Sequence, residues 1–131
     1  MEKEKINLLI IDDEERFLHT TKKLLEKKGI HTMTAVSGTA GFDILSTQPV
    51  DVVLLDVKMP GMSGTGVLKK IKKTHPDIEV IMLTGHATVK SAVDGVKKGV
   101  FDYLMKPCDI DELTEKIEAA YAKRKEGGGG R

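Results

Sequence analysis

The feature that most constrains the fold of this chain is an alternation between short apolar runs and longer amphipathic stretches. The apolar runs are rich in β-branched residues and continuous, which is typical of strands buried on both faces of a parallel sheet. We predict strands at residues 6–11, 32–36, 52–55, 80–83 and 103–105. Five strands separated by helical segments argue for a parallel sheet that is covered by helices on both faces.

The first amphipathic stretch, residues 14–29, has the periodicity of a helix. Phe17, Thr21, Leu24 and Leu25 share one face, while lysines fill the opposite face. Gly29 follows the last periodic residue and can adopt the left-handed conformation that ends a helix. We therefore expect a helix whose apolar face packs on the sheet.

The last amphipathic stretch, residues 109–124, predicts a second long helix. Its apolar stripe is formed by Ile110, Leu113, Ile117 and Tyr121, and Asp109 and Glu112 can form a capping box at its start. Between these two helices, segments 38–47, 64–74 and 87–98 are expected to be helical, although glycines interrupt each of them.

The pattern as a whole predicts one α/β domain at residues 1–124 with a doubly wound parallel sheet, for which we expect the flavodoxin-like strand order 2-1-3-4-5. Residues 125–131 include four consecutive glycines and are predicted to be a flexible tail. The tail is compatible with a linker to a further domain, a cloning remnant or a frayed native end.

Composition excludes several classes of function. The single cysteine, Cys108, cannot form an internal disulfide, which favours a reducing cytoplasm. No apolar run approaches the roughly 18 residues of a membrane span, and the N-terminus lacks the apolar segment of a signal peptide. We therefore expect a cytoplasmic protein without a membrane partner. Lys and Arg total 21 against 20 acids, so charge gives no argument for direct nucleic-acid contact.

Polar side chains follow four of the five predicted strands. Asp12 and Asp13 end the first, Asp56 the third, Thr84 the fourth and Lys106 the fifth. In a doubly wound sheet, ligands bind outside the carboxyl ends of the strands, at the point where the strand order reverses. These five residues, far apart in the chain, are therefore expected to converge on one site.

The residue types at this site point to phosphoryl transfer. Three carboxylates repel one another unless a cation joins them, and one or two carboxylates with waters and a phosphate oxygen are a usual arrangement for Mg²⁺. A lysine binds phosphate as a point charge, and a threonine hydroxyl can donate to a phosphoryl oxygen. One carboxylate could then attack phosphorus and form an aspartyl phosphate.

Four motifs, "LLIIDDEE", "DVVLLDVKMPGMSG", "VIMLTGHA" and "FDYLMKP", resemble the receiver domain of two-component response regulators, in order and at the expected spacing, across roughly residues 5–124. The resemblance implies that Asp56 is the phosphoacceptor. It also implies that Asp12, Asp13, Asp56 and the backbone carbonyl of Lys58 hold Mg²⁺, for which Mn²⁺ could substitute.

The same resemblance gives roles to the remaining site residues. Lys106 would bind the phosphoryl group, with a cis peptide bond between Lys106 and Pro107. Thr84 would be the switch hydroxyl and Tyr103 the aromatic residue coupled to it. The N–H of Gly85 would donate to the phosphoryl group, which a side chain at that position would crowd.

Two further positions, Lys58 and His86, stand two residues after Asp56 and Thr84. By resemblance, both overhang the mouth of the site and set the lifetime of the phosphorylated state, without deciding whether it forms.

The resemblance also implies partners. A sensor histidine kinase would donate the phosphoryl group. Relatives commonly form a homodimer through helix four, strand five and helix five, which are the segments predicted here at 87–98, 103–105 and 109–124. The chain would be a signalling phosphoacceptor and not an enzyme. The segment from Leu83 to Pro107 is especially similar to receivers of enhancer-binding transcription activators, so either a stand-alone receiver or a part of a longer regulator fits the sequence.

Two alternatives remain open from the residues. An aspartate-nucleophile phosphatase would carry a second aspartate two residues after the nucleophile, where this chain has Lys58. A pseudo-receiver that binds partners without phosphorylation would typically lack the acceptor, an acid or the lysine, and this chain retains Asp12, Asp13, Asp56 and Lys106.

Overall fold

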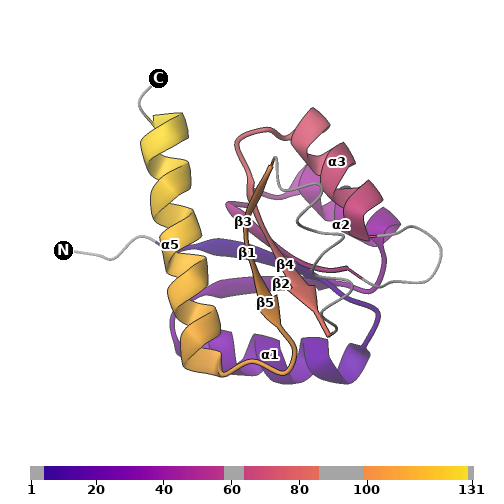
Figure 1. The fold of residues 1–131 in the computed structure, drawn as a ribbon, viewed down its shortest axis with the longest axis vertical. Coiled ribbons are helices and arrows are strands. Elements are labelled where there is room, and N and C mark those ends of the chain that lie inside the picture. Colours follow the sequence, from indigo (N-terminus) through magenta and orange to yellow (C-terminus); the bar gives the residue numbers. More distant parts are fainter. Residues whose placement is uncertain (1–4, 58–63, 86–98, 130–131) are drawn as a thin grey trace.

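The fold is built on a five-stranded parallel sheet with strand order β2-β1-β3-β4-β5 (Figure 1), as the sequence predicted. The structure is a computed structural model that describes residues 5–57, 64–85 and 99–129 of the chain. The strands are β1 (Asn7–Ile11), β2 (His31–Ala35), β3 (Val52–Asp56), β4 (Glu79–Thr84) and β5 (Val100–Met105). β5 begins three residues earlier than predicted, directly after Gly99, which has a left-handed φ of 102°.

Helices cover both faces of the sheet (Figure 1). α1 (Glu15–Lys27) and α5 (Ile110–Gly129) lie on one face, and α2 (Gly38–Thr47) and α3 (Gly64–Thr74) lie on the other. The helix predicted at 87–98 lies outside the described residues. None of the helices in the described ranges is both long enough and apolar enough to cross a lipid bilayer.

The C-terminal helix extends beyond residue 124, the predicted end of the domain. α5 continues to Gly129, so the predicted tail at 125–131 begins inside this helix. Arg124 anchors the helix to the sheet because its Nη1 lies 3.1 Å from Oδ1 of Asp51, the residue that precedes β3. The division of the chain at residue 124 stays a prediction.

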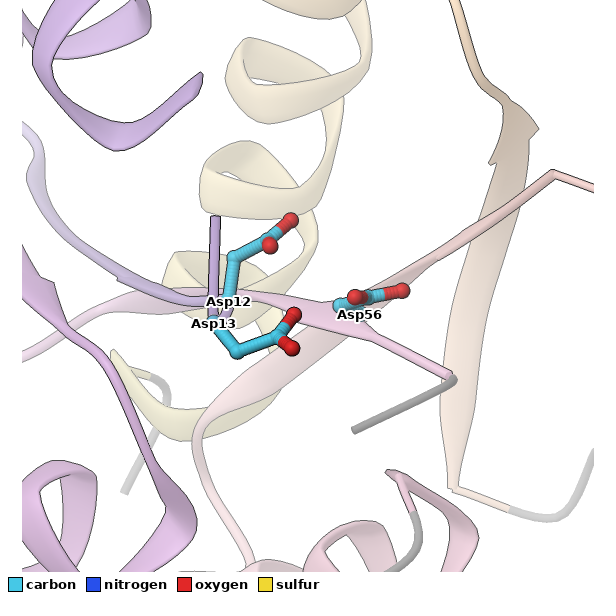
Figure 2. Close-up of side chains that lie close together, drawn as sticks. All are labelled: Asp12, Asp13 and Asp56. Atoms are coloured by element: carbon cyan, nitrogen blue, oxygen red, sulfur yellow. The ribbon is translucent and has the colours of Figure 1, made fainter. Parts of the chain in front are cut away.

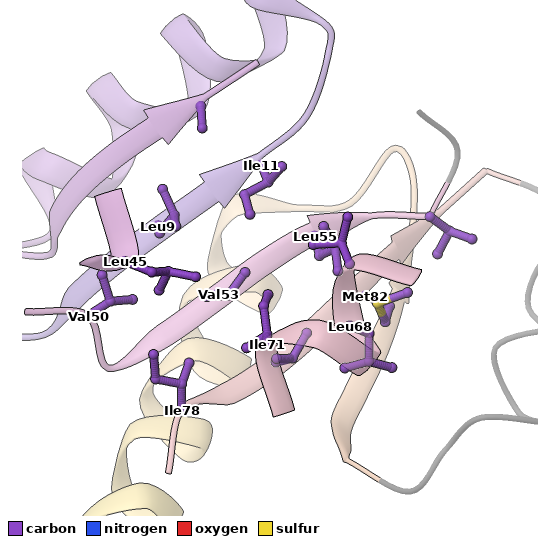
Figure 3. Close-up of a cluster of buried hydrophobic side chains, with 14 residues drawn as sticks. Leu9, Ile11, Leu45, Val50, Val53, Leu55, Leu68, Ile71, Ile78 and Met82 are labelled. Atoms are coloured by element: carbon purple, nitrogen blue, oxygen red, sulfur yellow. The ribbon is translucent and has the colours of Figure 1, made fainter. Parts of the chain in front are cut away.

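Two hydrophobic cores fill the space between the sheet and the helices. The α2/α3-side core (Figure 3) includes buried residues of β1, β3 and β4, such as Leu9, Leu55 and Met82. The α1/α5-side core contains the residues that alternate with them, such as Ile10, Leu54 and Leu83. Because both faces of β1, β3 and β4 are covered, these strands are nearly continuous apolar runs, which explains the pattern of the sequence.

The inward face of α1 differs from the prediction. Leu18, Thr21 and Leu25 are buried, whereas Leu24, which was expected to share the apolar face, is 39% exposed. One residue corresponds to about 100° around a helix, so a face centred on Leu18, Thr21 and Leu25 turns Leu24 to the flank. Gly29, which follows the C-cap residue Lys28, has a left-handed φ of 85°, as its position predicted.

The stripe predicted for α5 is confirmed. Leu113 and Ile117 are buried in the α1/α5-side core, and Ile110 and Tyr121 pack against it. At the start of the helix, the Asp109 carboxylate accepts a hydrogen bond from the backbone N–H of Asp111 over 3.1 Å. The helix therefore begins with an aspartate cap and lies firmly against the sheet.

Candidate functional site

Three aspartates gather at the carboxyl ends of β1 and β3 (Figure 2). Asp12 and Asp13 follow β1, and Asp56 is the last residue of β3. One carboxylate oxygen from each residue lies within 4.8 Å of the others. Asp12 is fully buried, Asp56 is 7% exposed and Asp13 is exposed, so the cluster opens toward solvent on the side of Asp13.

The local backbone explains why these carboxylates converge. β1 pairs with both β2 and β3, and the N–H of Asp12 still bonds to the carbonyl of Ala35 at the end of β2, over 3.0 Å. On the other side of the sheet's centre, the N–H of Val57 bonds to the carbonyl of Leu83 over 2.9 Å. These bonds fix the chain just beyond the strands and hold Asp12 and Asp56 at one edge.

The carboxylate cluster has the chemistry of a divalent-cation site. Oxygen donors of this kind suit a hard cation such as Mg²⁺, and two of the three groups are almost removed from water. A bound cation would offset the repulsion between carboxylates that lie this close together. Asp12, Asp13 and Asp56 therefore could hold a metal ion, whereas Lys58, whose carbonyl was expected to join them, lies outside the described residues.

Lys106 brings a positive charge from the end of β5 to this cluster. Its Nζ lies 2.7 Å from Oδ2 of Asp12 and 4.0 Å from Oδ2 of Asp56, and its side chain is 17% exposed. Burial by itself would lower the pKa of Lys106, but its hydrogen bonds with Asp12 and Glu14 outweigh burial and raise that pKa. The lysine is therefore held as an ammonium ion between the carboxylates.

Two neighbours of Lys106 were not anticipated as members of the site. Oε1 of Glu14 accepts a hydrogen bond from Nζ of Lys106 over 2.9 Å, and this bond lowers the pKa of Glu14. Nζ of Lys106 also lies 4.4 Å from the centre of the Phe17 ring, within the range of a cation–π contact. From the sequence alone, Glu14 is an ordinary acidic residue at the start of a helix. Its position directly after Asp13 is the one sequence feature that connects it with the site.

Lys106 is tied to the neighbouring strand through its backbone. Its N–H donates to the carbonyl of Thr84 over 2.7 Å, and the peptide bond from Lys106 to Pro107 is cis. Thr84, the last residue of β4, is buried with 1% exposure. The structure thus brings Thr84 and Lys106 to the same edge as the three aspartates.

Gly85 and Tyr103 occupy the surroundings of this edge. A Cβ added to Gly85 would meet no atom within 4 Å, so packing in this structure does not itself require glycine at that position. Tyr103 lies on β5, half-buried against the α2/α3-side core and opposite Met82 of β4. His86, the second position expected at the mouth of the site, lies outside the described residues, as does Lys58.

A sequence profile of the response regulator receiver domain matches residues 8–118. The DNA-binding transcriptional regulator NtrC of Klebsiella pneumoniae is 38% identical over 117 residues, which cover 89% of this chain and 25% of that protein. This chain spans about a quarter of the length of the curated relatives that it matches first.

Solved structures agree with this similarity. A response regulator receiver domain protein from Clostridium thermocellum is 40% identical, with a TM-score of 0.84, and the match covers 92% of this chain and 97% of that one. The receiver domain of NtrX from Brucella abortus is 30% identical, with a TM-score of 0.79, and the match covers 88% and 98% of the two chains.

Proposed function

Because the chain belongs to the response regulator receiver domain family, we propose that it is a signalling switch in which Asp56 accepts a phosphoryl group from a histidine kinase. One observation carries the proposal: Asp56 lies nearly buried beside two further carboxylates and 4.0 Å from the Lys106 ammonium. A receiver of this kind passes on a signal and does not turn over a substrate.

Asp56 is the proposed nucleophile. Its carboxylate oxygen forms a bond to phosphorus as the bond from phosphorus to the kinase imidazole breaks, and the departing imidazole nitrogen keeps the electron pair and takes up a proton. Lys106 stabilises the negative charge that spreads over the phosphoryl oxygens during this transfer. The hydroxyl of Thr84 and the N–H of Gly85 are the proposed hydrogen-bond donors to the transferred group.

The proposed cofactor is Mg²⁺, with Mn²⁺ as a substitute, held by Asp12, Asp13, Asp56 and the backbone carbonyl of Lys58. When bound, such a cation neutralises charge on the carboxylates and on the phosphoryl group. The acidic cluster supports this proposal because its oxygens lie close enough together to share one ion. The chain's own residues then orient the acceptor and exclude bulk water from the buried side of the site.

Phosphorylation is proposed to act through Thr84 and Tyr103. The new group adds about −1.5 to −2 charges next to Thr84. Thr84 turns toward that charge and leaves space for the Tyr103 ring, which changes the face formed by helix four, β5 and α5. Output then depends on how differently the phosphoryl group interacts with the two conformations.

Lys58 and His86 are proposed to tune how long the phosphoryl group survives. Their positions, two residues after Asp56 and Thr84, are the basis of this expectation. Lys58→Ala and His86→Ala are expected to change the decay rate of the phosphorylated protein while leaving the amount that forms unchanged. Equal decay rates in wild type and both variants would remove the two residues from the mechanism.

The proposed partners are a sensor histidine kinase in the cytoplasm and a downstream target. The NtrC relative is described as DNA-binding, and the match covers only 25% of its length, which supports an attached output domain as one target. The receiver itself is not proposed to touch nucleic acid or membrane. A homodimer through helix four, β5 and α5 is expected after phosphorylation, and a monomer mass by light scattering at that stage would exclude it.

Intact-mass spectrometry tests the central proposal. The protein is incubated with Mg²⁺ and a small acyl phosphate, beside Asp56→Asn and a sample with the metal removed by a chelator. One added phosphoryl group that needs both Asp56 and Mg²⁺ is the expected result. If a folded wild type gains no mass from the acyl phosphate or from a histidine kinase, the chain acts as a phosphorylation-independent interaction module.

A further inference from the structure

The edge strand β5 contains a β-bulge next to Tyr103. Val80 of β4 pairs with Val100, but the next residue, Ile81, pairs with Asp102, so that Phe101 is an extra residue in β5. A bulge of this kind shifts the alternation of side chains between the two faces of the sheet by one residue.

The packing of the strand confirms this shift. Val100 and Tyr103 pack against the α2/α3-side core, whereas Phe101 and Leu104 belong to the α1/α5 side. Strict alternation would place Val100 and Leu104 on one face and Tyr103 on the opposite face. The alternation of side chains between the two faces of the sheet is therefore interrupted once, between Phe101 and Tyr103.

The exchange places Tyr103 on the same face as Thr84. Tyr103 pairs with Met82, which packs in the α2/α3-side core, and Thr84 stands two residues after Met82 on the same strand. Without the extra residue, Tyr103 would pair with Leu83, which lies in the α1/α5-side core, on the far side of the sheet. The bulge is the reason that the two proposed switch residues can meet.

Asp102 holds the bulge with both oxygens of its carboxylate. Oδ1 accepts a hydrogen bond from the backbone N–H of Tyr103 over 2.8 Å, and Oδ2 forms an ion pair with the Lys116 ammonium of α5. The ion pair turns Asp102 toward α5, the same side of the sheet as Phe101. Two consecutive side chains on one face define the bulge, and Asp102 fixes the second of them.

We propose that Asp102 and Lys116 are positioning residues of the switch: they hold the bulge that keeps Tyr103 on the face of Thr84. This inference rests on the proposed function, because it assumes that Tyr103 responds to the phosphoryl group. The two residues affect the conformational response and not phosphoryl transfer, since neither belongs to the carboxylate cluster or contacts Lys106 within the described part of the chain.

The resting position of Tyr103 can be tested without phosphorylation. The chain has two tyrosines, so tyrosine-labelled NMR gives two sets of ring signals, which Tyr121→Phe assigns. In wild type, the Tyr103 ring is expected to show a nuclear Overhauser effect to the Met82 methyl group. Asp102→Ala is expected to lose it. Asp111→Asn is the matched control, because Asp111 lies on α5 like Lys116 but forms its ion pair with Lys28 at the end of α1. This variant is expected to keep the Overhauser effect.

Lys116→Met provides a second variant that removes the ion pair but keeps the hydrogen bond from Tyr103 to Asp102. In Lys116→Met, the intensity of the Overhauser effect between Tyr103 and Met82 is expected to lie between the intensities in wild type and in Asp102→Ala. Circular dichroism is expected to show that the fold is intact. A Met82 contact of full intensity in both variants would overturn the proposed role of Asp102 and Lys116.

The response is tested with Mg²⁺ and beryllofluoride, a phosphoryl analogue. The Tyr103 signal is expected to shift in wild type and Asp111→Asn, and to lose at least half of that shift in Asp102→Ala, which still gains a phosphoryl group from acyl phosphate. An equal shift in all proteins overturns the inference. A wild type that gains no phosphoryl group contradicts the proposed function instead, and the Met82 contact then still decides whether Asp102 positions Tyr103.

Discussion

The Nζ of Lys106 lies 2.7 Å from Oδ2 of Asp12, and this pair joins the end of β5 to the end of β1. Asp12 is fully buried, so the lysine offsets a charge that water cannot reach. A divalent cation that binds Asp12 would have to compete with this ammonium. The Lys106 ammonium and a metal ion therefore compete for the carboxylates of Asp12 and Asp56.

Replacing Lys106 with methionine is expected to strengthen Mg²⁺ binding. Two unit charges about 4 Å apart interact by roughly 4 kcal/mol near a protein surface, and solvent and lysine movement reduce the observable effect to about ten-fold in affinity. Isothermal titration calorimetry of Lys106→Met measures it, with Lys28→Met as a control because Lys28 pairs with Asp111. Unchanged or weaker binding in Lys106→Met would contradict the competition.

Glu14 is expected to oppose the phosphorylated state. Its carboxylate holds the Lys106 ammonium at 2.9 Å and stays ionised at neutral pH, because the hydrogen bond with Lys106 lowers the pKa of Glu14. Glu14→Gln removes this competing charge, and we expect beryllofluoride to bind roughly three- to ten-fold more tightly at saturating Mg²⁺.

The control for this experiment is Glu15→Gln, which removes the same charge from the adjacent position of α1. Lys106 forms its ion pairs with Asp12, Glu14 and Asp56, so Glu15→Gln is expected to bind the analogue like wild type. If both variants gain affinity for beryllofluoride equally, the effect comes from net charge and not from the ion pair between Glu14 and Lys106.

The convergence of the site could be predicted because it depends on strand ends alone. Asp12, Asp56 and Thr84 each follow an unbroken apolar run, and parallel strands bring such ends to one edge whatever their exact register. The pairing of Lys106 with Asp12 and Glu14 could not be predicted. It depends on the conformation of one long side chain that lies within reach of several carboxylates.

The face of each side chain on β5 was also beyond prediction. The run Val100–Met105 carries no strict alternation of polar and apolar residues, and its bulge depends on pairing with β4 and on the ion pair from α5. In α1, helical periodicity does not distinguish among the four residues of the predicted apolar face. The rotation of the docked helix about its axis places Leu24 at the flank.

Gly85→Ala is expected to separate function from folding. A Cβ at this position meets no atom within 4 Å and the φ angle of Gly85 is not left-handed, so the free energy of unfolding should change by less than about 0.5 kcal/mol. The methyl group is nevertheless expected to crowd a phosphoryl group on Asp56 and to weaken beryllofluoride binding several-fold. Thermal unfolding that shows a large loss of stability would instead assign Gly85 a structural role.

The thiol of Cys108 is expected to react slowly in the folded protein. Burial raises the pKa of Cys108, and the nearby acids Glu112 and Asp109 raise it further, so the thiolate forms at higher pH than in the unfolded chain. Stability from the protonated thiol is present below the unfolded pKa, about 8.5, and is lost as pH rises through the folded value. A thiol-reaction midpoint below 8.5 in the native state would refute this.

The proposed domain end at residue 124 can be tested through the ion pair between Arg124 and Asp51. Asp51 is only 14% exposed at its side chain, and its other oxygen accepts the N–H of Asn7 over 2.9 Å, so Arg124 ties α5 to the start of the sheet. Arg124→Met is expected to lower the free energy of unfolding by about 1–2 kcal/mol. Removing residues 125–131 should change it by less than about 0.5 kcal/mol. Denaturant unfolding of these two proteins and wild type measures both effects, and a truncated chain as unstable as Arg124→Met would move the boundary into the glycine segment.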